Sequence, residues 1–172
     1  MKDVLNRREI LLLLTGAAAA LQLPAAEPSS PLFFTGDEFR MLDTLTELII
    51  PSDDHSPGAR AAGVAAYIDR SLAEAYLPNE RDSWRKGLSA INDLSVALCH
   101  CRFNENSAGR QIDLLTRIAK NEQRPSTPAE RFFVKLKSMT ASVYYTSEIG
   151  IHQEIQYLGN TLLEQYAGFD AS

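Results

Sequence analysis

Apolar side chains recur three or four positions apart along most of the chain, which predicts helices rather than strands. In the segment 35–50 these positions are Phe39, Leu42, Leu45, Leu48 and Ile49. Thr35 and Glu38 stand three residues apart at its start, so their side chains can satisfy free backbone N–H groups as a capping box. Phe34, just before the cap, is placed to pack on Phe39 as a hydrophobic staple. Pro51 then ends the expected first helix, because proline cannot continue a helix.

Four further segments show the same periodicity. A fourth helix is expected to be capped near Ser107, and the order Thr127, Pro128, Glu130 predicts a capping box at the start of a fifth. The expected apolar faces of the second to fifth helices are Val64, Tyr67, Ile68, Leu72 and Tyr76; Trp84, Leu88, Ile91, Leu94 and Leu98; Ile112, Leu115 and Ile118; and Phe132, Phe133, Leu136, Met139 and Val143. No segment shows strand-like alternation. The pattern therefore predicts an all-α fold, a compact helical bundle of about five to six helices with irregular loops and an extended C-terminal tail.

The first 26 residues have the layout of an export signal, with a basic head, an apolar middle and an end of small residues. The uncharged run Ile10–Leu23 has 14 residues, fewer than the roughly 20 that a spanning helix needs. Arg7 and Arg8, separated from this run only by Glu9, resemble the twin-arginine signal of bacteria, which exports folded proteins. We expect an export signal over 1–26, a linker over 27–34 and one helical domain over 35–172. A buried or amphipathic N-terminal helix is the alternative.

The charge balance argues against a nucleic-acid partner. The chain has 17 basic and 22 acidic residues, a formal net charge of −5. Without residues 1–26 there remain 14 basic and 20 acidic residues, which makes the net charge −6. A protein that follows a phosphate backbone needs a large basic patch. We therefore expect no nucleic-acid binding.

The two cysteines lie together in "LCHC", at Cys99 and Cys101. They are too few for a disulfide framework, and two residues apart on a helix they point to different sides. A metal site built on Cys99, His100 and Cys101 would need a further ligand, and His55 and His152 are the remaining histidines. We interpret the cysteines as small side chains near a helix end and expect no metal site.

The loop "SDDH" is the other cluster that suggests chemistry, because two carboxylates and an imidazole are close together there. Ser and Asp after a proline are also typical of a turn, since their short side chains bond nearby backbone groups. The sequence has no Gly-rich phosphate loop, nucleophile elbow or HExxH pattern. We expect no catalytic, cofactor-binding or metal-binding residue in this chain. The loop residues that we interpret as structural are Pro51, Asp53, Asp54, Pro57 and Gly58.

The stretch "VYYTSEIG" near the end of the fifth helix contains two adjacent tyrosines. Successive helical residues are rotated by about 100°, so Tyr144 and Tyr145 cannot both be fully buried on the core face. Tyrosine is favoured at protein interfaces because it has an apolar ring and a polar tip. Core packing and an interface role are both compatible with these tyrosines. The candidate partner interface is Tyr144, Tyr145, Thr146, Ser147 and Glu148.

Several segments together resemble the gluconate 2-dehydrogenase subunit 3 family. They are the twin-arginine head, "FTGDEFRMLDTLTELIIPSDDHSPGARAAGVAAYIDRSLA", "RFFVKLKSMTASVYYTSEIG" and "YLGN". The end "YAGFD" departs from the family, because Phe169 and Asp170 stand where many relatives have a cysteine. The spacing of "IIPSDDHSPGA" from "YYTSEIG" is more specific than either segment alone.

The resemblance implies a non-catalytic small subunit of a membrane-associated, FAD-dependent sugar or polyol dehydrogenase in the periplasm. The large GMC-type subunit would hold FAD, and a cytochrome c subunit with haem c would take the electrons. The small subunit would support folding, assembly and twin-arginine export of the flavoprotein through the twin-arginine translocase.

Two other functions are compatible with the sequence. One is an independent periplasmic enzyme or metal-binding protein that uses Asp53, Asp54 and His55. The other is a membrane-tethered scaffold whose uncleaved head stays in the bilayer.

Overall fold

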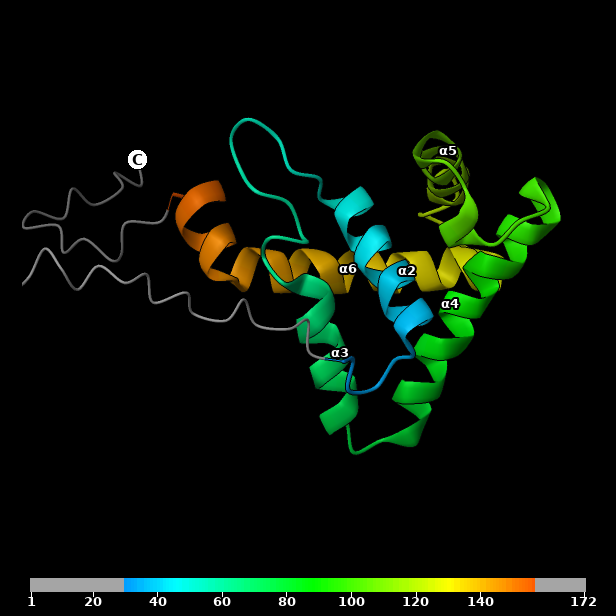
Figure 1. The fold of residues 1–172 in the computed structure, drawn as a ribbon, viewed down its shortest axis with the longest axis horizontal. Helices are drawn as coiled ribbons and strands as arrows, with labels where there is room; N and C mark the ends of the chain where they lie inside the picture. The colour runs from blue at the N-terminus through cyan, green and yellow to red at the C-terminus, as the bar shows by residue number, and fades with distance from the viewer. Residues whose placement is uncertain (1–29, 157–172) are drawn as a thin grey trace, which may run out of the picture. The chain divides into compact units, whose positions relative to one another are not determined.

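The computed structural model describes residues 30–156, which fold into five α-helices and two short helices (Figure 1). The helices are α2 (Gly36–Ile49), α3 (Val64–Glu74), α4 (Pro78–Cys99), the 3-10 helix η1 (Phe103–Glu105), α5 (Ala108–Ala119), α6 (Pro128–Thr146) and the π-helix η2 (Gly150–Glu154). None of the described residues lies in a strand, and the all-α prediction is confirmed. Arg7, Arg8 and the expected C-terminal tail lie outside the described residues.

Helix α6 is the centre of the bundle, because it contacts α2, α3, α4, α5 and η2. In Figure 1 it crosses behind α2, with α4 near its yellow end and α3 below its other half. Its closest neighbour is α4, where the Phe132 ring lies against Gly87. A Cβ atom at Gly87 would come within 2.0 Å of the Phe132 ring, so α4 packs closely here only because glycine has no side chain. Trp84, one turn earlier, meets the same ring edge to face with the centroids 5.4 Å apart.

The two predicted capping boxes are confirmed. At the start of α2, the Thr35 N–H donates to the Glu38 carboxylate over 2.8 Å, and the Glu38 N–H donates to the Thr35 hydroxyl over 3.3 Å. At the start of α6, Glu130 accepts from the Thr127 N–H over 2.9 Å and from the Asn121 amide over 2.7 Å. These hydrogen bonds favour the charged carboxylate and lower the pKa of Glu130 from 4.5 to about 2. The bond from the Thr127 N–H has the largest effect, and the bond from Asn121 has the next largest.

The expected apolar face of α3 is wrong at its two tyrosines. Tyr67 is exposed, and Tyr76 is 95% exposed beyond the end of the helix. The buried stripe is instead completed by the small Ala65 and by Asp69, whose polar side chain a hydrophobic pattern does not select. Because Ala65 and Asp69 are buried, the buried face of α3 does not include Tyr67.

The expected faces of α4 and α5 are also wrong at one residue each. Leu98, in the last turn of α4, is exposed, and so is Ile112 in α5. The buried position next to Ile112 belongs to Gln111, whose amide donates to the Phe103 carbonyl oxygen over 3.0 Å. Burial of a polar group is tolerated when it is hydrogen-bonded, so Gln111 takes the place that periodicity assigns to an apolar residue.

The expected linker is too long, because Phe33 and Phe34 are part of the core. The carboxylate of Asp69 in α3, which is 3% exposed, accepts backbone N–H groups from Leu32 over 2.6 Å, from Phe33 over 3.0 Å and from Phe34 over 2.9 Å. Arg85 in α4 donates to the Phe33 carbonyl oxygen over 2.7 Å, and its guanidinium lies over the Phe33 ring. The folded unit therefore begins before α2.

Within residues 30–156, no helix is both long enough and apolar enough to cross a bilayer.

Candidate functional site

The two cysteines have separate surroundings, and both thiols are free. Cys99 ends α4, and His100 caps the helix in the left-handed conformation with a φ of 58°. The Cys101 thiol donates to the Asn106 side-chain oxygen over 3.1 Å. Over the described range, no three His, Cys, Asp or Glu side chains gather in a way that would hold a metal ion.

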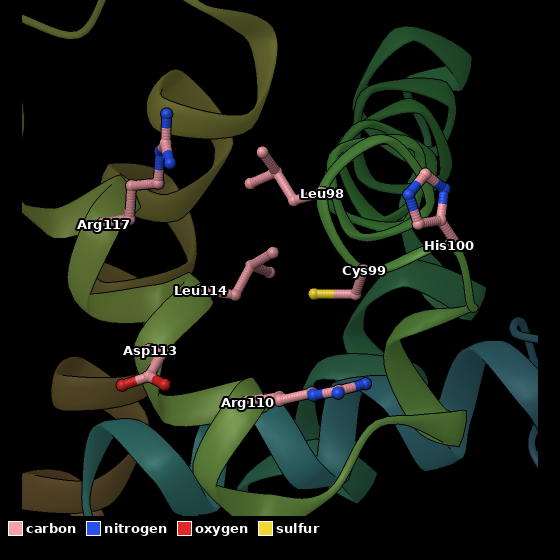
Figure 2. A pocket seen from close by; sticks show the side chains of 7 residues that line it. All are labelled: Leu98, Cys99, His100, Arg110, Asp113, Leu114 and Arg117. Atoms are coloured by element: carbon pink, nitrogen blue, oxygen red, sulfur yellow. The ribbon is translucent and has the colours of Figure 1, made fainter.

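A groove of about 430 Å³ lies between the end of α4 and α5 (Figure 2). We call it the α4–α5 groove, and its lining residues are Leu98, Cys99, His100, Arg110, Asp113, Leu114 and Arg117. In Figure 2 the side chains of Leu98 and Cys99, from the end of α4, point across the gap toward Leu114 of α5, and Arg110 and Arg117 lie at its two ends. The groove therefore has an apolar middle and two cationic ends.

The loop Pro51–Gly58 uses its polar groups to hold its own backbone. The Asp53 carboxylate accepts the N–H groups of His55 and Ser56, each over 2.8 Å, and the Asp53 N–H donates to the Ser56 carbonyl oxygen over 3.0 Å. Both hydrogen bonds to the carboxylate favour its charged form and lower the pKa of Asp53, and the bond from the His55 N–H has the larger effect. Asp53 therefore shapes a turn, as the sequence predicts. Asp54 and His55 are exposed beside it.

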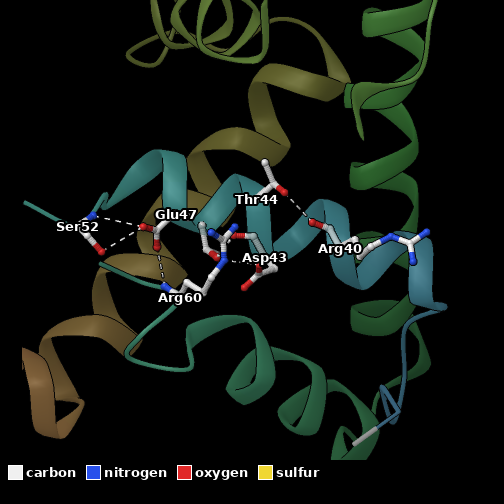
Figure 3. Close-up of polar contacts among 7 residues, drawn as sticks. Arg40, Asp43, Thr44, Glu47, Ser52 and Arg60 are labelled. Atoms are coloured by element: carbon white, nitrogen blue, oxygen red, sulfur yellow. Dashed lines mark hydrogen bonds and ion pairs between the residues drawn. The ribbon is translucent and has the colours of Figure 1, made fainter. Parts of the chain in front are cut away.

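The other end of the loop is attached to α2 through Glu47 (Figure 3). Its carboxylate accepts the Arg60 N–H over 2.8 Å and the Ser52 N–H over 3.3 Å. The Ser52 hydroxyl in turn accepts the Gly58 N–H over 2.7 Å. Gly58 is so close that a Cβ atom there would lie 2.5 Å from the Ser52 nitrogen. The Arg60 guanidinium also pairs with Asp43 over 2.7 Å, so this part of the loop is held by several contacts to one helix.

Tyr144 connects the loop to α6. Its hydroxyl donates to the Pro57 carbonyl oxygen over 2.7 Å and lies 2.6 Å from the Ser56 hydroxyl. Tyr144 is 1% exposed, so the expectation that it lies at a partner interface is wrong for this residue. Its polar tip is satisfied inside the chain.

The remaining residues of the candidate interface differ in exposure. Tyr145 is 44% exposed, and its ring packs edge to face on Tyr144 with the centroids 5.4 Å apart. Thr146 and Glu148 are exposed, and Ser147 is half-buried with its hydroxyl donating to the Tyr144 carbonyl oxygen over 2.6 Å. The prediction that both tyrosines cannot be buried together is confirmed. The surface at the end of α6 consists of Tyr145, Thr146 and Glu148.

Sequence reasoning did not identify the α4–α5 groove or the contact between Ser56 and Tyr144. The groove has a local signal, since Arg110 and Arg117 are seven residues apart and thus share one helix face. The second contact joins residues 88 positions apart, and no local pattern marks it.

Comparison with known protein families gives one match. A family model described as gluconate 2-dehydrogenase subunit 3 matches residues 36–163. Searches of curated proteins and of solved structures found no match. The matched range includes all five described α-helices, the loop Pro51–Gly58 and the α4–α5 groove. The chain therefore belongs to the gluconate 2-dehydrogenase subunit 3 family.

Proposed function

We propose that the chain is the non-catalytic small subunit of an FAD-dependent, GMC-type sugar or polyol dehydrogenase, and that it supports folding and assembly of the flavoprotein subunit. Membership of the gluconate 2-dehydrogenase subunit 3 family carries this proposal, because the family is an accessory subunit of a dehydrogenase complex. FAD belongs to the large subunit in this proposal, and haem c to a cytochrome c subunit that accepts the electrons.

The contacts of the loop Pro51–Gly58 support an accessory role. Asp53 belongs to the acidic loop cluster that suggests chemistry in the sequence. Its carboxylate is hydrogen-bonded to two backbone N–H groups. Those bonds lower its pKa, whereas a general base benefits from a pKa near the working pH. We infer that this loop is a structural element of the subunit.

The end of α6 is the surface that we propose for the large subunit. Tyr145 has an exposed ring that is held in place by its edge-to-face contact with Tyr144. A rigid aromatic side chain loses little conformational entropy on binding, which favours it as an interface anchor. Thr146 and Glu148 lie beside it as rim residues, where a screened charge contributes little.

We further propose that the signal containing Arg7 and Arg8 directs export of both subunits through the twin-arginine translocase. A flavoprotein that binds FAD in the cytoplasm has to cross the membrane folded, and a twin-arginine signal is read on folded proteins. One signal would then serve two chains, and the complex would be located in the periplasm at the inner membrane.

Co-expression with the flavoprotein that we expect to be encoded beside it tests the accessory role. We expect the two chains to copurify, with all turnover dependent on the flavin of the large subunit. The double variant Asp53→Ala, Asp54→Ala should keep the turnover per flavin of the assembled complex, although it can lower the amount assembled. Turnover by this chain alone, or a large loss of turnover per flavin in a fully assembled complex of the double variant, would contradict the proposal.

A further inference from the structure

We propose that the α4–α5 groove binds an extended acidic segment of the large subunit, with an apolar side chain between two carboxylates. This inference rests on the proposed function for the identity of the partner. It adds a second contact surface to the one at the end of α6.

The middle of the groove fits an apolar side chain. Leu98 is exposed in the last turn of α4, although it follows the apolar periodicity of that helix. Together with Cys99, Leu98 faces Leu114 across the gap (Figure 2). An exposed leucine at the edge of a cavity loses water-accessible apolar area when a partner covers it, which favours binding.

The two ends of the groove fit carboxylates. Arg110 and Arg117, which both line the groove, form no ion pair with any other side chain of residues 30–156. Asp113 is the single acidic residue of the lining, against two arginines. The rim of the groove is therefore positive on a chain whose net charge is −5. Charge complementarity of this kind selects an acidic partner and speeds its association.

The spacing of the arginines defines the ligand further. Seven residues along a helix correspond to a rise of about 10 Å. An extended peptide advances about 3.3 Å per residue and places every second side chain on the same face. Carboxylates four residues apart, separated by about 13 Å, therefore face the groove together, and the long arginine side chains can reach them. The side chain midway between the carboxylates lies on the same face, over Leu98 and Leu114. Arginine is well suited to this role because it binds a carboxylate through two parallel hydrogen bonds.

Titration of the purified chain with the FAD-loaded large subunit tests the proposal. We expect the double variant Arg110→Glu, Arg117→Glu to bind roughly 30-fold more weakly and to lose the salt dependence of the wild type. Leu98→Ser should bind about tenfold more weakly without a change in salt dependence. The matched control is Arg70→Glu with Lys86→Glu, which makes the same charge change at exposed residues elsewhere. Circular dichroism should show equal helix content in all variants.

The outcomes separate this inference from the proposed function. If the wild type does not bind the flavoprotein, both proposals are wrong. If it binds and the groove variant binds as well as the control, the groove inference alone is wrong.

Two other occupants are tested in the same series. The first is a membrane surface, tested by sedimentation with vesicles of one part phosphatidylglycerol and three parts phosphatidylcholine. A membrane role would be indicated if vesicle binding required the two arginines and flavoprotein binding did not require them. The second is the protein's own C-terminal segment, tested with a variant that ends at residue 156. That segment would be the occupant if flavoprotein binding by the shortened variant no longer depended on the two arginines. Either result would overturn the proposal, and binding that stays arginine-dependent in the shortened chain would support it.

Discussion

The loop Pro51–Gly58 and the α4–α5 groove use their charged side chains in opposite ways. The loop concentrates acidic residues and a histidine, yet the carboxylate of Asp53 is bound to its own backbone and Glu47 holds the loop to α2. In the groove, Arg110 and Arg117 have no ion-pair partner among residues 30–156. The residue types suggest chemistry in the loop, but the contacts show that the loop uses its polar groups internally and that the groove leaves two arginines for a partner.

Tyr144→Ala should have the largest effect on stability, because Tyr144 belongs to the internally bonded region. The change removes a fully buried ring and both hydrogen bonds to the loop. Truncation of a large buried aromatic side chain typically costs about 3 to 5 kcal/mol. Urea unfolding followed by circular dichroism measures this loss.

The matched control for that variant is Tyr145→Ala, which should cost less than about 1 kcal/mol because its side chain is partly exposed. Flavoprotein binding should fall in Tyr145→Ala while the fold is kept. Equal destabilisation by the two variants would mean that the adjacent tyrosines do not divide between core and surface.

Gly58→Ala should have the next largest effect. The new Cβ atom would lie 2.5 Å from the Ser52 nitrogen and 2.7 Å from a Glu47 carboxylate oxygen. Overpacking of a site without free space costs about 1 to 3 kcal/mol. Gly36→Ala is the control, because a Cβ atom there meets no other atom within 4 Å. A melting temperature that is unchanged in Gly58→Ala would show that the loop is looser than its contacts indicate.

Asp53→Asn should have a smaller effect that depends on pH. The hydrogen bonds from His55 and Ser56 lower the pKa of Asp53 below 3.8, so the charged carboxylate stabilises the fold at pH values above 3.8. This contribution is lost as the pH falls through the lowered pKa. The melting temperatures of the wild type and Asp53→Asn should therefore differ at pH 7 and converge in acid. A difference that is constant from pH 7 to pH 2 would argue against a stabilising charge at this position.

Arg117→Ala should have the smallest effect on stability, within about 0.5 kcal/mol of the wild type. The side chain is exposed and has no ion pair with another described residue to lose. Thermal unfolding checks this value. A clear destabilisation would show that Arg117 serves the fold of the chain itself, and the contrast with the loop would then disappear.

The features that local sequence decides were predicted well. Both capping boxes, the end of α2 before Pro51 and the turn around Asp53 follow from residues within a few positions of one another. The faces of α3 and α5 were less predictable, because Asp69 and Gln111 are buried through bonds to distant backbone groups.

The exposed state of Leu98 could not be predicted, since it depends on how α4 meets α5. For the same reason the groove was not identified from the sequence, although its two arginines were visible there. Local pattern fixes where helices begin, and the contacts between helices determine which of their side chains remain exposed.

The most direct test of the accessory role is cell fractionation that locates the flavoprotein subunit. It compares cells that produce the wild-type chain with cells that produce the double variant Arg7→Lys, Arg8→Lys. We expect the flavoprotein to reach the periplasm with the wild-type chain and to stay in the cytoplasm with the variant, because we propose that its export depends on the signal of its small subunit. A flavoprotein that reaches the periplasm at normal levels with the variant, or without this chain, would contradict this proposal.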